Sequence, residues 1–157
     1  MPTRRQATRF SLAAIALVTL SVMTGCAMMD RMMSRQSNMV AFTTQLRAAN
    51  EVPPNASPGT GSVDAAFNKD TNQLRWKVNY SGLTGPATAG HFHGPAAVGA
   101  NAGVALPWSS PMSSGMDGSA TLTPAQAADL MAGRWYANVH TAAHPGGELR
   151  GQMTVRN

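Results

Sequence analysis

The four histidines of this 157-residue chain lie in two short segments, His91-Phe92-His93 and His140 to His144. In an extended strand, residues i and i+2 point to the same face, so His91 and His93 would lie about 6–7 Å apart along the chain, with Phe92 facing the opposite way. His140 ends a second predicted strand, and His144 follows in a turn. If those strands are neighbours, three or four imidazoles meet, which makes all four histidines candidate metal ligands.

The chemistry of imidazole indicates which metals such a site would bind. An all-imidazole site favours copper, or alternatively zinc, over calcium and magnesium. Glu148 is a candidate to accept a hydrogen bond from a ligating histidine; otherwise Glu148 and Arg150 would form a surface pair on one strand face. In the competing interpretation no metal binds, and the histidines are structural groups that hydrogen-bond to the backbone of the surrounding Gly-Pro turns.

Strands would have to position these histidines. From residue 40 onward, short apolar runs alternate with turn residues, as is typical of β structure. In the run 73–80, Leu74, Trp76 and Val78 fall on one face, which is the period-two pattern of a half-buried strand. Strands are predicted near residues 40–47, 61–67, 73–80, 87–93, 103–107, 118–122, 134–140 and 147–155. We therefore expect an all-β fold, an antiparallel two-sheet sandwich of immunoglobulin-like or Greek-key type.

One short helix is predicted near residues 124–132. Thr123 is a suitable N-cap, Pro124 suits the first helical position, and Gln126 completes a capping-box pattern. Gly133 then provides a stop.

Residues 1–25 have the pattern of a signal peptide. A basic start with Arg4, Arg5 and Arg9 precedes an apolar stretch from Leu12 to Met23. That stretch is shorter than the roughly 20 residues that a transmembrane helix needs. With the three arginines set aside, nine basic residues face seven acidic ones, so the net charge of +5 largely reports this segment. The charge therefore gives no support to nucleic-acid binding.

Cys26 is the only cysteine, which excludes an internal disulfide framework. Met23-Thr24-Gly25-Cys26 resembles the lipobox of bacterial lipoproteins, and it predicts lipidation of Cys26 and attachment to a membrane. Ala27 stands where inner-membrane lipoproteins commonly have aspartate, so the resemblance favours the periplasmic face of the outer membrane. Ordinary secretion with an unused thiol is the alternative.

Residues 26–39 form a methionine-rich tether. They hold five of the eleven methionines, which are Met28, Met29, Met32, Met33 and Met39. The composition favours a flexible linker near the membrane surface. A copper-collecting arm is the alternative, since thioethers are soft ligands that prefer Cu(I).

Several motifs of the remaining chain resemble the CHRD domain, a family named from chordin. These are residues 50–54 (NEVPP), 74–83 (LRWKVNYSGL), 89–96 (AGHFHGPA), 133–141 (GRWYANVHT) and 145–152 (PGGELRGQ). The resemblance assigns residues 40–157 to one CHRD domain and implies an all-β fold in an extracytoplasmic setting. Bacterial members often stand alone behind signal peptides. The motifs map onto His91, His93 and His140, whereas other members often have asparagine at the position of His144.

Three classes of function compete. The first is a lipoprotein that binds copper, or zinc, for metal handling or redox protection. The second is a copper-dependent oxidoreductase, similar in ligand pattern to copper–zinc superoxide dismutase but without its arginine-bearing loop and disulfide. The third is a non-catalytic module that binds an envelope protein or polymer. No hydrolase elbow, phosphate-binding loop or dinucleotide fingerprint occurs. We expect metal binding, without assured catalysis.

Overall fold

The computed structural model describes residue 29 and residues 38–156. The chain divides into two units, residues 1–37 and 38–157, and the fold below is that of the second unit. The predicted signal peptide 1–25, the predicted lipidation residue Cys26 and most of the tether 26–39 lie outside the described residues. In the described part of the chain, no helix is long and apolar enough to cross a membrane.

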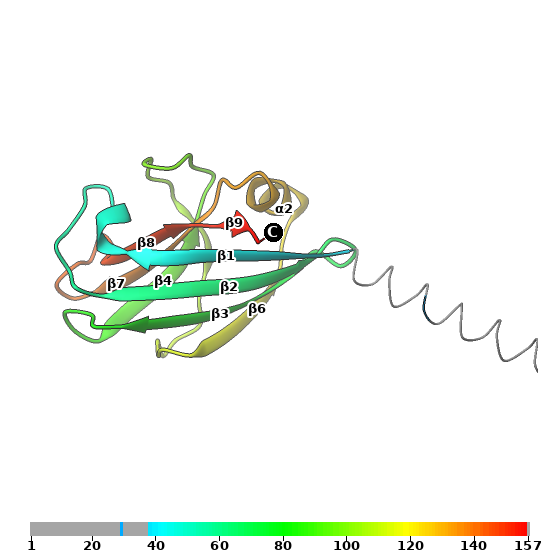
Figure 1. Ribbon diagram of the computed structural model, residues 1–157. Coiled ribbons are helices and arrows are strands. Elements are labelled where there is room, and N and C mark those ends of the chain that lie inside the picture. Colours follow the sequence, from blue (N-terminus) through cyan, green and yellow to red (C-terminus); the bar gives the residue numbers. More distant parts are fainter. Residues whose placement is uncertain (1–28, 30–37, 157) are drawn as a thin grey trace, which may run out of the picture. The chain divides into compact units, whose positions relative to one another are not determined.

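The second unit is built mainly of β-strands, which confirms the predicted class and the strand positions (Figure 1). The last predicted strand, 147–155, is divided into two. The elements in chain order are β1 Met39–Arg47, η1 Ala48–Asn50, β2 Thr60–Asn68, β3 Gln73–Ser81, β4 Ala87–His93, β5 Val104–Pro107, β6 Met116–Thr121, α2 Pro124–Met131, β7 Tyr136–Thr141, β8 Leu149–Gln152 and β9 Thr154–Val155.

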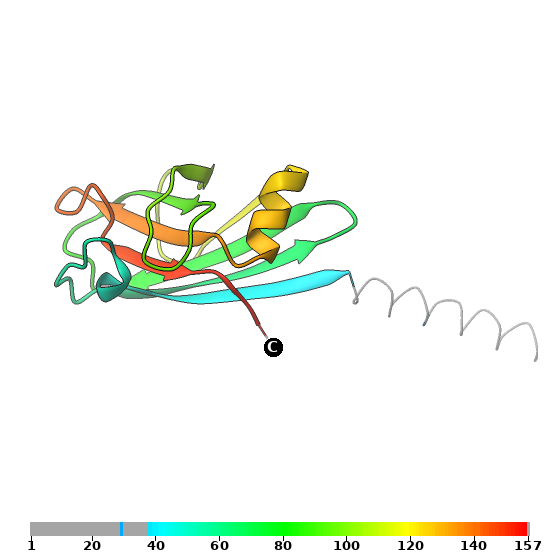
Figure 2. The ribbon, with the colours of Figure 1, turned by 90° about the horizontal axis from the view of Figure 1, so that it is seen from above.

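The strands form one continuous antiparallel sheet in the order β5-β4-β7-β8-β1-β2-β3-β6, with β9 paired to β1. The junction between the two halves is narrow, because β8 and β1 share the single register pair Arg47 and Arg150. The sheet curls there, and β4, β7 and β8 come to lie across from β1, β2 and β3 (Figures 1 and 2). The predicted two-sheet sandwich is therefore not confirmed. Period-two alternation is the same in a curled sheet and a sandwich, so it does not separate them.

The apolar core fills the inside of the curl, with aromatic rings around Phe92 of β4. The Phe92 ring centroid lies 5.4 Å from that of Trp76, 5.2 Å from Trp108 and 5.7 Å from Trp135. All four side chains are buried. Phe92 thus faces the core as predicted, which directs its neighbours in β4 to the opposite face of the sheet.

The short helix α2 is confirmed and begins as the sequence predicts. Thr123 accepts a hydrogen bond from the Gln126 backbone, and the Gln126 side chain returns one to Thr123, which completes the capping box. Gly133 follows the helix with a φ of +69°. The Gln126 side chain also donates to the carbonyl of Ala105, 2.8 Å away, and so ties the helix to β5.

Strand β7 is buried on both faces, which sets it apart from β2 and β3. Its inner face contacts the core. Its outer face and that of β8 are covered by two segments, residues 48–55 and 94–103. Asn50 donates to the Arg150 carbonyl at 3.1 Å, and the Ala102 backbone donates to the Tyr136 hydroxyl at 3.1 Å. The candidate site lies in this covered outer layer.

Candidate metal centre

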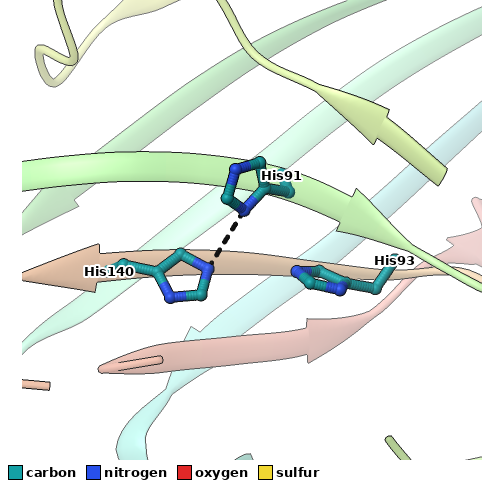
Figure 3. Close-up of side chains that lie close together, drawn as sticks. All are labelled: His91, His93 and His140. Carbon is teal, nitrogen blue, oxygen red and sulfur yellow. Dashed lines mark hydrogen bonds between the residues drawn. The ribbon is translucent and has the colours of Figure 1, made fainter. Parts of the chain in front are cut away.

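Three of the four histidines meet on the outer face of β4 and β7 (Figure 3). One ring nitrogen each from His91, His93 and His140 lie within 4.8 Å of one another. The ring centroids are 5.0 Å apart for His91 and His140 and 5.4 Å apart for His91 and His93. Strands β4 and β7 are antiparallel neighbours, so the pairing that the sequence left conditional is the one the fold adopts. We call these three residues the histidine trio.

Backbone carbonyls fix which nitrogen carries the proton in two of the rings. The Nδ1 of His93 lies 3.0 Å from the carbonyl oxygen of Ala102, and the Nδ1 of His140 lies 3.0 Å from that of Pro145. A carbonyl only accepts, so both Nδ1 atoms are protonated and both Nε2 atoms carry a lone pair. The His140 Nε2 lies 3.2 Å from the His91 Nδ1, which is placed to donate to it.

The buried lone pair on the Nε2 of His93 has no partner among the described residues. That atom is buried, and no hydrogen-bonding group of the described residues reaches it. A buried polar atom without a partner is uncommon and costs stability. A metal ion between the three rings would coordinate this nitrogen.

The electrostatics of the histidine trio keep its rings neutral. Burial lowers the pKa of all three histidines below their usual value. Nearby histidine charge lowers the pKa of His91 and His93 further, and the Arg150 guanidinium contributes at His93. The backbone hydrogen bonds of His93 and His140 oppose this in part. Neutral imidazoles are the form that binds metals, so the lone pairs are available at neutral pH.

The donor set fits copper or zinc. Histidine nitrogens bind zinc at about 2.0–2.1 Å, so an ion between the rings would draw together three nitrogens that now lie within 4.8 Å of one another. The ligand atoms would be the Nε2 of His93, the Nε2 of His140 and the Nδ1 of His91. For His91 this requires the ring proton to move from Nδ1 to Nε2, which changes the tautomer and releases no proton.

His144 lies outside the histidine trio. Its contribution to the site runs through the backbone. The His144 backbone N–H lies 3.2 Å from the Thr141 carbonyl and 3.3 Å from the Thr141 hydroxyl, and the Gly147 N–H donates to the His144 carbonyl at 3.1 Å. These bonds shape the turn that presents the Pro145 carbonyl to His140.

Glu148 contacts hydroxyl groups instead of the predicted histidine. Its carboxylate accepts from the Ser57 hydroxyl (2.6 Å), the Thr84 backbone and hydroxyl (both 2.8 Å) and the Thr141 hydroxyl (2.5 Å). Burial raises the pKa of Glu148, but these four hydrogen bonds outweigh it and lower the pKa to about 2. The Nδ1 atoms of His93 and His140 donate to the carbonyls of Ala102 and Pro145, not to Glu148.

The predicted surface pair of Glu148 and Arg150 is also wrong, since both side chains are buried. Arg150 lies with its Cζ 3.5 Å from the centroid of the Tyr136 ring, and that ring stacks on His93. Tyr136 is not among the residues that the sequence predicts for the site. The signal was present, because the alternation of β7 puts Tyr136 on the same face as His140.

Comparison with known protein families matches residues 42–153 to the CHRD domain. No curated protein and no solved structure shows a significant match to the chain. The matched region contains the whole histidine trio and most of the curled sheet. It also confirms the resemblance that the sequence motifs carry, and the chain belongs to the CHRD domain family.

Proposed function

We propose that this chain is an exported CHRD-domain lipoprotein that binds one transition-metal ion, copper in preference to zinc, through His91, His93 and His140. The observation that carries the proposal is the convergence of three neutral imidazoles in which the buried His93 Nε2 has no partner among the described residues. Three core tryptophan N–H groups and the Asn138 Oδ1 are also unpaired among the described residues, so the convergence of the three rings carries more weight than the unpaired atom alone.

Copper is favoured over zinc on chemical grounds. Both ions accept three neutral nitrogens, but sites of this type bind Cu(II) more tightly than Zn(II). Three protein ligands leave a fourth position of a four-coordinate ion for water or an exchangeable ligand. Such a site suits metal handling or redox protection, and the open position is also what a copper-dependent oxidoreductase would need.

The proposed location rests on the N-terminal sequence. The pattern of residues 1–25 supports export, and Cys26 in its lipobox-like setting supports anchoring by acylation. Ala27 after it favours the periplasmic face of the outer membrane. A metal-binding domain tethered there would meet copper and zinc as they enter the periplasm.

The test is a titration of the purified protein with Cu(II) and with Zn(II) in competition with chelators. These oxidation states avoid the soft thioether ligands of the methionine-rich tether, which prefer Cu(I). We expect one equivalent of tightly bound metal. The double variant His91→Ala/His93→Ala should bind at least about 100-fold more weakly, because it leaves a single trio ligand.

The matched control is His144→Ala, which removes a histidine outside the trio and should change the affinity less than about threefold. The proposal fails if the folded wild-type protein binds no metal, or if the folded double variant binds as tightly as the wild type. In that event the histidines are scaffold, and the non-catalytic module that binds an envelope protein or polymer becomes the leading interpretation. If metal does bind, a superoxide dismutation assay separates a carrier from an enzyme.

A further inference from the structure

The His93 ring lies at one end of a stack of three side chains. Its plane is within 3° of parallel to the Tyr136 ring, with the centroids 4.9 Å apart. The Arg150 guanidinium carbon lies 3.5 Å from the Tyr136 centroid. His93 belongs to β4, Tyr136 to β7 and Arg150 to β8, and β7 is the middle strand of the three. Among the described residues, no ring is stacked in this way on His91 or His140.

The same two residues also hold the loop that orients His93. The Tyr136 hydroxyl contacts Ala102 twice: it accepts from the Ala102 N–H at 3.1 Å and donates to the Ala102 carbonyl at 3.3 Å. That carbonyl is the one that receives the Nδ1 proton of His93. Arg150 donates to the Asn101 side chain at 2.8 Å and to the Ala100 carbonyl at 2.5 Å.

We infer that Tyr136 and Arg150 are positioning residues of the metal centre, which hold the His93 ring with its Nε2 directed at the other two ligand nitrogens before a metal arrives. The stack fixes the plane of the ring, and the Ala102 carbonyl fixes its rotation within that plane. Because the ring is already ordered, binding pays less conformational entropy. This inference rests on the proposed function.

A role in stability alone accounts poorly for Arg150. Its side chain is only 2% exposed. Among the described residues, no carboxylate lies within 4.0 Å of it, and its charge acts on the carboxyl group of Glu51 only from farther away. Burying a charge without an ionic partner is costly, and an apolar side chain can often replace it without loss of stability. The Arg150 guanidinium is planar and carries several N–H donors, so it covers the Tyr136 ring and donates to two groups of the loop at the same time. A shape of this kind is needed to hold the ring and the loop in fixed positions.

The test measures Cu(II) and Zn(II) affinity and the Cu(II) electron paramagnetic resonance spectrum of three variants. Contacts of this kind to metal ligands are worth about 10–100-fold in affinity, and we expect Tyr136→Leu to lose that much. Its copper spectrum should also broaden, because the His93 ring is less fixed. Tyr136→Phe keeps the stack but loses both hydroxyl contacts with Ala102, so its affinity should lie between those of Tyr136→Leu and the wild type. Tyr80→Leu, on β3, is the control and should bind as the wild type does.

Arg150→Lys provides a second test in case Tyr136→Leu does not fold. It keeps the charge and loses the fork, so we expect an affinity loss of about 3–10-fold with the fold intact. The inference is overturned if folded Tyr136→Leu or folded Arg150→Lys binds both metals as tightly as the wild type with an unchanged spectrum. If the wild type binds neither metal, it is the proposed function that fails.

Discussion

Strands β7 and β8 have two buried faces of opposite chemistry, and the outer face of the neighbouring strand β4 is half-buried. The inner face is apolar and belongs to the core, with Phe92, Ala137, Val139 and Leu149. The outer face is polar and is covered by residues 48–55 and 94–103. Its side chains include His91, His93, Tyr136, Asn138, His140 and Arg150, and the last four are less than one-tenth exposed. On β7 and β8 both faces are buried, so the faces differ mainly in the kind of interaction that stabilises them.

The inner face depends on packing, which is not directional, whereas the outer face depends on individual hydrogen bonds. Asn138 donates to Glu51 at 2.6 Å, and Arg150 donates to the loop that contains Asn101. The outer face also leaves two acceptors without partners among the described residues, the His93 Nε2 and the Asn138 Oδ1. An unsatisfied acceptor weakens such a polar layer, and a metal ion between the rings would give the His93 Nε2 a partner.

The largest expected effect on stability separates the two faces at neighbouring residues of β4. Phe92→Ala removes a fully buried ring from the core and should lower the free energy of unfolding by about 3–5 kcal/mol. His91→Ala, on the half-buried outer side, should lower it by less than about 1 kcal/mol. Urea denaturation of the metal-free variants measures both values.

Thr88→Ala, at an exposed position of the same strand, is the control and should stay within about 0.5 kcal/mol of the wild type. If His91→Ala proved as destabilising as Phe92→Ala, the outer layer would be a second core, and the contrast between the faces would be lost.

A somewhat smaller effect is expected at Glu148, the buried carboxylate whose pKa is lowered to about 2. Its ordinary value is higher, so the ionised form stabilises the fold above about pH 4.5, and this stability is lost as the pH falls through about 2. Glu148→Gln should therefore cost about 2–4 kcal/mol at neutral pH, because it weakens hydrogen bonds to a charged acceptor. The difference from wild type should shrink in acid. Urea denaturation at pH 7 and near pH 3 measures it.

Asp117→Asn, on the outer face of β6, is the matched control and should shift stability by less than about 0.5 kcal/mol at either pH. If the stability difference between Glu148→Gln and the wild type is the same at both pH values, the negative charge of Glu148 does not strengthen its four hydrogen bonds.

The sequence predicted the strands and the helix because their signals are local. Turn residues bound each strand, and the capping box that begins at Thr123 marks the start of the helix. On β2 and β3, burial follows the alternation of the sequence closely. The curl of the sheet was not predictable in the same way. It depends on the pairing of Arg47 with Arg150, which lie about a hundred positions apart in the sequence. No sequence feature of their two strands indicates that these strands pair.

The same distinction explains the site. His91 and His93 share a strand, so their common face was predictable, and His140 needed only the pairing of β4 with β7. The contacts of Glu148 were not predictable, because its donors Ser57 and Thr84 come from loops distant in the sequence. The sequence predicts Arg150 at the surface, because no residue near it in the sequence indicates that residues 48–55 and 94–103 cover it.

The smallest expected effect concerns Glu51, the second buried carboxylate. It tests whether the burial of this polar side chain lowers the free energy of unfolding. Burial raises the pKa of Glu51 to about 7, against the hydrogen bond from Asn138 and the charge of Arg150. Since the folded state favours the protonated form, that stability is fully present below about pH 4.5 and is lost as the pH rises through about 7. Glu51→Gln keeps an acceptor for Asn138 and removes the titration.

We therefore expect Glu51→Gln to match the wild type near pH 4.5 and to be about 1–2 kcal/mol more stable near pH 8.5, as measured by urea denaturation at both pH values. Asp117→Asn again serves as the control and should show no such divergence. A variant less stable than the wild type at pH 8.5 would show that ionised Glu51 and Arg150 stabilise each other. The outer layer would then contribute to stability much as the core does, and the support for a metal site would rest on the convergence of the three imidazoles, with the unpaired His93 Nε2 beside it.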